Sequence, residues 1–195
     1  MAEPIFDLKG VAYAYAAHIP ALRSLDLTVE RSSRVALIGA NGTGKSTLLS
    51  ILDALFFPDR GEMRAFGKKI DARSMRDAET QKEFRRKVGF VFQNPDAQLF
   101  CPTAREDIAF GPLQLGVSRE ETSDRIARIA ERLRIEQLLD RAPHQLSVGE
   151  KRKVSIAGVL AIGCDALLLD EPTAGLDPRT TRDIIGAIED EHRAG

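Results

Sequence analysis

The stretch Gly39-Ala40-Asn41-Gly42-Thr43-Gly44-Lys45-Ser46 matches the pattern G-x-x-x-x-G-K-[ST] at every fixed position. Glycines at these positions allow tight turns in which backbone N–H groups point inward at phosphate oxygens. An apolar run at 34–38 precedes the stretch, and a helical repeat of leucine and isoleucine follows it over 46–57. This order predicts a P-loop between a buried strand and a helix whose positive dipole end binds nucleotide phosphates.

The side chains of the P-loop are expected to bind both phosphate and metal. Lys45 would reach the β and γ phosphates of ATP, Ser46 would ligate Mg²⁺, and Thr47 would add a phosphate donor. The nucleotide-binding residues expected here are Gly39, Asn41, Gly42, Thr43, Gly44, Lys45, Ser46 and Thr47.

Two acids, Asp170 and Glu171, directly follow the apolar run 166–169, which is typical of a central strand buried on both faces. In a doubly wound sheet the carboxyl ends of the strands form the ligand edge. Asp170 is expected to hold Mg²⁺ through water, and Glu171 to orient or deprotonate the attacking water. Gln93 ends another expected strand, and its amide oxygen is a further Mg²⁺ ligand candidate beside its catalytic role.

The composition is that of an ordinary soluble chain large enough for one α/β core with a small subdomain. It has 195 residues, 43% hydrophobic and 29% charged, with a net charge of −1. Such a charge does not indicate a broad polyanion-binding surface. Two cysteines without C-x-x-C spacing fit a reducing compartment. No apolar stretch is long enough to span a membrane, and the acidic, proline-broken start does not suit a signal peptide.

Hydrophobic periodicity gives an α/β order of elements. We expect helices at 73–86, 120–139, 148–162 and 178–193, with Asp177 as the N-cap of the last. Residues 98–143 are interpreted as a mostly helical insertion. The expected strands are 5–8, 11–15, 25–29, 34–38, 62–66, 88–92 and 166–169.

The segment Leu146-Ser147-Val148-Gly149-Glu150 lies between Gln93 and Asp170 in the chain. With the P-loop before it, this order resembles the ATP-binding cassette family, whose signature is L-S-G-G-Q. The resemblance implies an α/β P-loop NTPase core with an N-terminal antiparallel β subdomain and an inserted α-helical subdomain. It implies one domain, 1–195, in which 1–97 and 144–195 form the core and about 98–143 form the helical subdomain.

The signature departs from the family pattern at two positions, Val148 and Glu150. The resemblance implies that Ser147, Val148, Gly149 and Glu150 face the nucleotide of a second cassette in a head-to-tail dimer. Ser147 with Glu150 three residues later also fits a capping box, and the two interpretations are compatible.

Three further features come from the resemblance. It implies that Tyr15 stacks on adenine, with a core tyrosine as the alternative. It implies that Asp177 lies in the loop by which the two subunits sense each other. It also places a histidine after the last helix, and none of His18, His144 and His192 matches. We therefore expect a cassette truncated at its C-terminus.

The stretches 91–100 and 106–112 resemble the ATPases of energy-coupling-factor importers, including the cobalt and nickel type. This implies an ATP- and Mg²⁺-dependent ATPase subunit for metal ion or vitamin import, docked on a transmembrane subunit at the cytoplasmic face of the membrane. Its other partner would be a second cassette, identical or different. The alternative is a nucleotide-binding module with little or no hydrolysis. Nothing in the sequence favours a cassette that works on nucleic acid.

Overall fold

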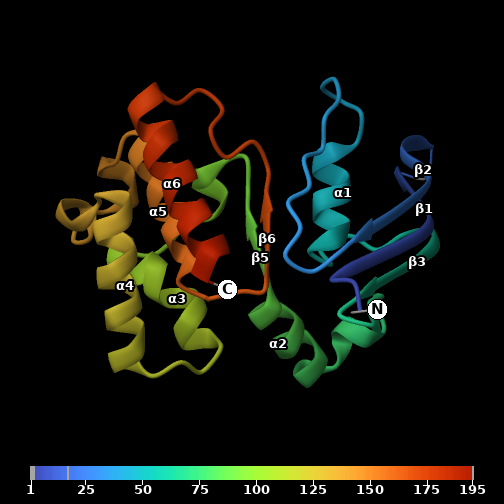
Figure 1. The fold of residues 1–195 in the computed structure, drawn as a ribbon, viewed down its shortest axis with the longest axis horizontal. Helices are drawn as coiled ribbons and strands as arrows, with labels where there is room; N and C mark the ends of the chain where they lie inside the picture. The colour runs from blue at the N-terminus through green and yellow to red at the C-terminus, as the bar shows by residue number, and fades with distance from the viewer. Residues whose placement is uncertain (1–2, 17, 195) are drawn as a thin grey trace. The chain divides into compact units, whose positions relative to one another are not determined.

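The computed structural model describes residues 3–16 and 18–194. The chain divides into two compact units, residues 1–84 and 85–195, and each is described by itself. Figure 1 shows both units as a ribbon. Gly195, where we expected the last helix to have stopped, lies outside the described residues.

The first unit is built on a four-stranded antiparallel sheet in the order β2-β1-β3-β4. Its strands are β1 (Phe6–Tyr15), β2 (Ile19–Val29), β3 (Arg60–Ala65) and β4 (Lys68–Lys69). The two short strands expected at 5–8 and 11–15 form one continuous strand. Gly10 adopts a left-handed conformation at φ +58°, and the pairing register shifts between Leu8 and Val11, so the strand continues through an irregularity. This confirms the N-terminal antiparallel β region.

Helix α1 (Lys45–Leu52) follows the glycines of the P-loop, and its apolar side chains are buried. It is shorter than the expected 46–57, because Ala54 takes a left-handed conformation at φ +55° and the chain turns. The short 3₁₀ helix η1 (Ser74–Arg76) and helix α2 (Ala78–Lys87) replace the single helix expected at 73–86. Asp77 separates them and caps α2 by accepting from Thr80 N at 2.9 Å.

The buried strand expected at 34–38 is wrong for this structure. The segment has no strand assignment, and Val35 and Ile38 are 52% and 94% exposed. An apolar run predicts a strand only where another strand accepts its hydrogen bonds, and none pairs with these residues in the part of the chain that the structure describes.

The second unit contains a parallel pair of strands, β5 (Val88–Val91) and β6 (Ala166–Leu169), in register from Val88↔Ala166 to Val91↔Leu169. Leu168 is buried, whereas the other three β6 residues are half-buried, so the expectation of burial on both faces holds only in part. The long connection between the strands is helical. Its helices are η2 (Pro95–Ala97), α3 (Ala104–Gln114), α4 (Arg119–Leu133), η3 (Glu136–Leu138), η4 (Pro143–Gln145) and α5 (Val148–Leu160), and α6 (Pro178–Ala194) follows β6.

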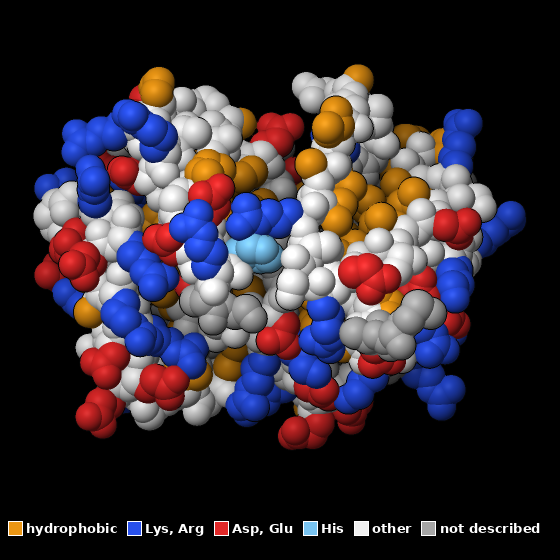
Figure 2. All heavy atoms as spheres, in the orientation of Figure 1, with side chains coloured by type: hydrophobic (Ala, Val, Ile, Leu, Met, Phe, Trp, Pro, Cys, Tyr) orange, Lys and Arg blue, Asp and Glu red, His pale blue; other side chains and the backbone are white. Residues whose placement is uncertain are grey.

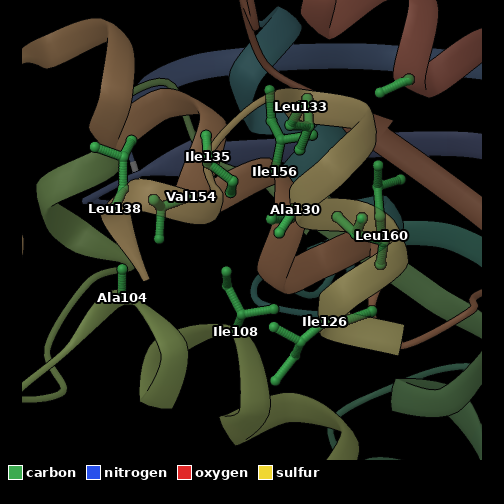
Figure 3. Packing of buried hydrophobic residues seen from close by; sticks show 14 of the residues in the cluster. Ala104, Ile108, Ile126, Ala130, Leu133, Ile135, Leu138, Val154, Ile156 and Leu160 are labelled. Atoms are coloured by element: carbon green, nitrogen blue, oxygen red, sulfur yellow. The ribbon is translucent and has the colours of Figure 1, made fainter. Parts of the chain in front are cut away.

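The helices of the second unit share one hydrophobic core. Ala104 and Ile108 of α3 and Ile126 of α4 pack in the same cluster as Val154 and Ile156 of α5 (Figure 3). Helix α4 ends at Leu133 instead of at residue 139, because Arg134 adopts a left-handed conformation at φ 57°. The expected helical insertion is therefore confirmed as helical, and it packs on α5.

The surface carries both charge signs. On the face shown in Figure 2, basic and acidic side chains are interspersed over the helices of the second unit. No helix of the described residues is both long enough and apolar enough to cross a membrane.

Candidate functional site

Side chains of the P-loop donate hydrogen bonds to main-chain oxygens of the same loop. Lys45 Nζ donates to the main-chain oxygens of Gly39 and Ala40, at 2.9 Å each, and Thr43 Oγ1 donates to Ala40 O at 2.8 Å. Gly44 precedes α1 at φ +93°, and a Cβ there would lie 2.5 Å from Ala21 O. Only glycine fits this position, and having no side chain it leaves the first N–H groups of α1 without a side-chain acceptor.

The start of α1 suits an anion. Its uncapped N–H groups carry the positive end of the helix dipole, and the Lys45 ammonium lies in the same loop. The hydroxyl of Ser46 belongs to an exposed residue, whereas Thr47 is only 6% exposed. The P-loop therefore offers uncapped helix N–H groups and a lysine that is bonded to main-chain carbonyls of the same loop.

Tyr15 lies beside this helix start. Its hydroxyl is 3.0 Å from Thr47 Oγ1, and its ring meets Tyr13 edge-on with 5.2 Å between centroids. Tyr13 in turn stacks on Phe56 at 5.3 Å with 5° between the ring planes. Tyr15 remains 40% exposed, so one part of its ring is anchored in an aromatic cluster while another part faces solvent.

In the second unit, the acids after β6 lie beside Gln93. Asp170 N donates to Val91 O at 3.0 Å, which extends the strand pairing by one step, and Asp170 is 7% exposed. Glu171 is exposed and takes a left-handed conformation at φ +47°, which is uncommon for a residue other than glycine. Gln93 Nε2 donates to Glu171 Oε2 at 2.8 Å. The structure thus brings together Gln93, Asp170 and Glu171.

Two residues that the sequence analysis did not assign to the site hold this strand end. Gln98 Oε1 accepts from Phe92 N at 2.9 Å, and Gln98 Nε2 donates to Phe90 O at 3.1 Å. Arg152 of α5 is 4% exposed and donates to the main-chain oxygens of Phe92 and Gln93. Burial lowers the pKa of the Arg152 guanidinium, and the charges of Asp170 and Glu171 oppose that shift.

A signal for Arg152 was present in the sequence. Arg152, Ile156 and Val159 recur at helical spacing, so the arginine occupies the apolar stripe of its helix, and all three are buried. A charged residue at such a position is buried only with partners, which makes it a candidate for a specific role. Gln98 lies in a loop where glutamine is common, so its spacing carries no comparable signal.

The signature residues form the start of α5. Ser147 is its N-cap: Ser147 Oγ accepts from Glu150 N at 3.3 Å, and Ser147 N donates to Glu150 Oε2 at 2.7 Å. The predicted capping box is confirmed, and the Ser147 N–H holds the pKa of Glu150 below its usual value. Val148 is 65% exposed on the first turn, and a Cβ added at Gly149 would lie 3.6 Å from the Thr180 methyl group of α6.

Asp177 caps α6, as the sequence predicts. Its carboxylate accepts from Arg179 N at 2.9 Å and Thr180 N at 3.0 Å, and from Thr180 Oγ1 at 2.6 Å. These bonds, that of the Thr180 side chain first, lower the pKa of Asp177.

The candidate residues thus divide between the units. Tyr15 and the P-loop belong to the first, whereas Gln93, Asp170, Glu171, the signature and Asp177 belong to the second. The proposed Mg²⁺ ligands Ser46, Gln93 and Asp170 offer oxygen atoms, the donor type that Mg²⁺ prefers, so the residues present fit that cation. No cluster of three or more His, Cys, Asp or Glu side chains within residues 3–16 and 18–194 is placed to hold a metal ion by itself.

A protein-family model described as ABC transporter matches residues 22–174. The chain belongs to the ABC transporter family. The cassette is 51% identical over 90% of its length to a putative ABC transporter ATP-binding protein of Methanosarcina acetivorans, of which it spans 65%. It is 49% identical to the nickel import ATP-binding protein NikO of Rhodobacter capsulatus, with 98% of the cassette and 75% of NikO covered. It is 44% identical to the energy-coupling factor transporter ATP-binding protein EcfA of Methanothermobacter thermautotrophicus, over 98% of the cassette and 60% of EcfA.

Solved structures agree with the family assignment. The cassette superposes on cbiO1 of Clostridium perfringens, part of the ABC transporter complex cbiONQ, with a TM-score of 0.81 and 33% identity, over 98% of the cassette and 75% of cbiO1. It also matches the dimeric cassette MJ0796 in a post-hydrolysis state bound to ADP and Pi, with a TM-score of 0.83 and 29% identity, over 97% of the cassette and 83% of MJ0796. The fold is that of a P-loop NTPase.

Proposed function

We propose that this cassette is the ATP-binding and ATP-hydrolysing subunit of a membrane importer and works as a head-to-tail dimer. The observation that carries the proposal is the hydrogen bond of 2.8 Å between Gln93 Nε2 and Glu171 Oε2, next to the buried Asp170. A carboxylate held by an amide beside a second carboxylate is an arrangement that serves both metal binding and water activation.

The side chains have separate roles in this proposal. The main-chain N–H groups of the P-loop and Lys45 bind the phosphates of ATP, and Tyr15 stacks on adenine. Ser46, Gln93 and Asp170 hold Mg²⁺, which when bound neutralises charge on the phosphates. Glu171 accepts a proton from the attacking water or orients it, while the Gln93 amide fixes the carboxylate.

The second nucleotide-facing surface is the start of α5. Because Ser147 Oγ accepts the N–H of Glu150 in the capping box, its own hydroxyl proton stays available to a phosphate of the partner cassette. The Gly149 N–H lies on the same helical turn and provides a second donor. The dimeric state of MJ0796 supports this arrangement, in which the 1–195 cassette acts as one domain and Asp177 lies in the loop between the subunits.

An importer of the energy-coupling-factor type is the best-supported setting. The relatives named NikO and EcfA cover 98% of the cassette each, and cbiO1 is described as part of a transporter complex. Phe100 is 66% exposed and Phe110 is 43% exposed, and their rings meet edge-on at 4.9 Å. We propose that the transmembrane subunit docks on this exposed aromatic pair, which follows Gln93 in the sequence, at the cytoplasmic face of the membrane. The cargo, a metal ion or a vitamin, is chosen by that membrane subunit.

ATP-dependent dimerisation tests the proposal directly. The Glu171→Gln protein is mixed with saturating Mg-ATP, and its mass is measured by light scattering. We expect a dimer, because binding without hydrolysis keeps the closed state populated. Lys45→Ala in the same background is the matched control and is expected to stay monomeric.

A Glu171→Gln protein that remains a monomer at saturating Mg-ATP contradicts the dimeric mechanism. Phosphate release by the unmodified chain, lost on Glu171→Gln, separates the ATPase from a module that only binds nucleotide.

A further inference from the structure

Arg152 is buried at a place where a hydrophobic residue would be less costly. It is 4% exposed on the core side of α5, and its Nε atom is buried without a hydrogen-bond partner. Its two bonded nitrogens contact neutral main-chain oxygens. A buried cation with an unsatisfied N–H is poor evidence for stability, because well-packed apolar residues often serve stability better. The arginine therefore calls for another explanation.

The bonds of Arg152 continue the strand pairing at the point where it ends. Val91 O accepts from Asp170 N at 3.0 Å, and beyond it no β6 residue pairs with β5. The next two main-chain oxygens, of Phe92 and Gln93, accept from Arg152 Nη1 and Nη2, the first at 2.7 Å. The guanidinium fixes the main chain of Gln93, and the side chain of Gln93 bonds to Glu171.

This chain of contacts starts at the signature. Arg152 lies five residues after Ser147 on the same helix, and α5 is continuous from Val148 to Leu160. A shift of α5 therefore moves the two oxygens that define the position of Gln93.

We propose that Arg152 is a positioning residue through which α5 sets the position of Gln93 and, by the Gln93–Glu171 hydrogen bond, the orientation of the Glu171 carboxylate for ATP hydrolysis. The inference rests on the proposed ATPase function. Contact of a phosphate with Ser147 at the start of α5 would thus change the orientation of the Glu171 carboxylate through the Arg152 side chain.

Steady-state kinetics of Arg152→Lys and Arg152→Gln test the proposal, because both variants keep at least one donor near the two oxygens. We expect kcat to fall by roughly 10- to 100-fold, as misplacement of a catalytic group by about 1 Å does, with nucleotide affinity changed less than about 3-fold.

A double-mutant cycle with Gln93→Ala shows whether Arg152 acts through Gln93. In the Gln93→Ala background, Arg152→Lys is expected to have little further effect on kcat. An equal loss of kcat in both backgrounds overturns the proposal.

The chain offers a matched control in Arg125. Its Nη1 also donates to two successive main-chain oxygens, those of Ala161 and Ile162, at 2.8 Å each, at the other end of α5. Arg125→Lys is expected to leave kcat within about 2-fold of the unmodified protein. If Arg125→Lys lowers kcat as strongly as Arg152→Lys, the effect is one of general helix packing and the proposal fails.

Hydrogen exchange separates failure of this proposal from failure of the proposed function. In Arg152→Gln without nucleotide, amides in the segment 92–98 are expected to exchange about 10-fold faster, whereas those of 161–164 are unchanged. This readout needs no ATP turnover. Unchanged exchange at 92–98 overturns the role of Arg152, and absence of Glu171-dependent turnover in the unmodified protein overturns the ATPase assignment instead.

Discussion

In the P-loop, Lys45 and Thr43 bond to main-chain oxygens of the same loop, whereas beyond β6 the side chains of Gln93, Glu171 and Arg152 join three separate segments. A loop that bonds to itself exchanges those bonds for a phosphate without disturbing its neighbours. At the strand ends, the position of each side chain depends on contacts with distant segments, so a shift of one segment is passed to the others. The comparison indicates that phosphate binding relies on contacts within one loop, whereas orientation of the hydrolytic carboxylate relies on contacts between segments.

The largest expected effect is the loss of ATP hydrolysis when Glu171 is replaced. Glu171→Gln preserves the shape of the side chain but removes the proton acceptor, so kcat should fall by roughly 10²- to 10⁴-fold with ATP binding retained. Phosphate release and nucleotide titration on the same preparation measure the two quantities. A variant that hydrolyses ATP at the unmodified rate would show that the carboxylate is not the base.

The second-largest effect is expected at the ion pair between α5 and α6. Lys153 Nζ lies 2.7 Å from Asp183 of α6, and both side chains are nearly buried, at 11% and 12% exposure. Asp183→Asn leaves the ammonium without its partner and should lower the free energy of unfolding by roughly 3 kcal/mol at pH 7. Urea denaturation followed by circular dichroism measures the loss. Glu191→Gln removes the exposed pair with Arg132 and is the control, with an expected change below about 0.5 kcal/mol.

The pH dependence of that variant gives a second check. The hydrogen bond from Lys153 holds the pKa of Asp183 below its ordinary value. A depressed folded-state pKa contributes stability above the unfolded pKa of about 3.9, and that contribution is lost as the pH falls through the folded value. The unmodified protein should therefore exceed Asp183→Asn in free energy of unfolding by a constant amount from pH 7 to about 5. Below about pH 4 this difference in free energy should become smaller. A difference that does not change with pH would argue against the ion pair.

A smaller effect, on the affinity for ATP, is expected from a substitution in the P-loop. Lys45→Ala removes a charged donor to the phosphates and should weaken ATP binding by about 10- to 100-fold, from about 1.5 to 3 kcal/mol per charged hydrogen bond. Titration with a fluorescent ATP analogue at fixed salt measures the change. Lys68→Ala, which removes an exposed lysine of β4, should bind ATP normally. Equal affinity of Lys45→Ala and unmodified protein would contradict the assigned role.

The smallest effect concerns Tyr15. Tyr15→Phe loses the hydroxyl contact with Thr47 but keeps the ring against Tyr13, so stability should fall by about 1 kcal/mol while ATP affinity stays within about 2-fold. Tyr15→Ala removes the ring and should weaken ATP binding about 5-fold. Thermal denaturation and the same titration distinguish the two variants. If Tyr15→Ala binds ATP like Tyr15→Phe, the ring does not stack on adenine.

Sequence reasoning worked where a local rule determines the outcome. The capping box of Ser147 and Glu150 and the N-cap at Asp177 follow from short patterns whose partners lie a few residues away. It failed at 34–38, because an apolar run does not specify which strand, if any, pairs with it. The sequence does not show what Arg152 contacts, because its partners lie about sixty residues away in the chain. Non-local hydrogen bonds are thus the part that composition and periodicity do not supply.

The left-handed backbone of Glu171 has a consequence for how this position evolves. Any residue with a Cβ is strained in that conformation, by about 1 to 2 kcal/mol, and glycine is not. Substitution by glycine would relax the backbone and abolish the carboxylate in one step. Screening a variant library for heat resistance alone would therefore enrich inactive proteins with glycine at residue 171, and only selection for ATP hydrolysis would retain the acid.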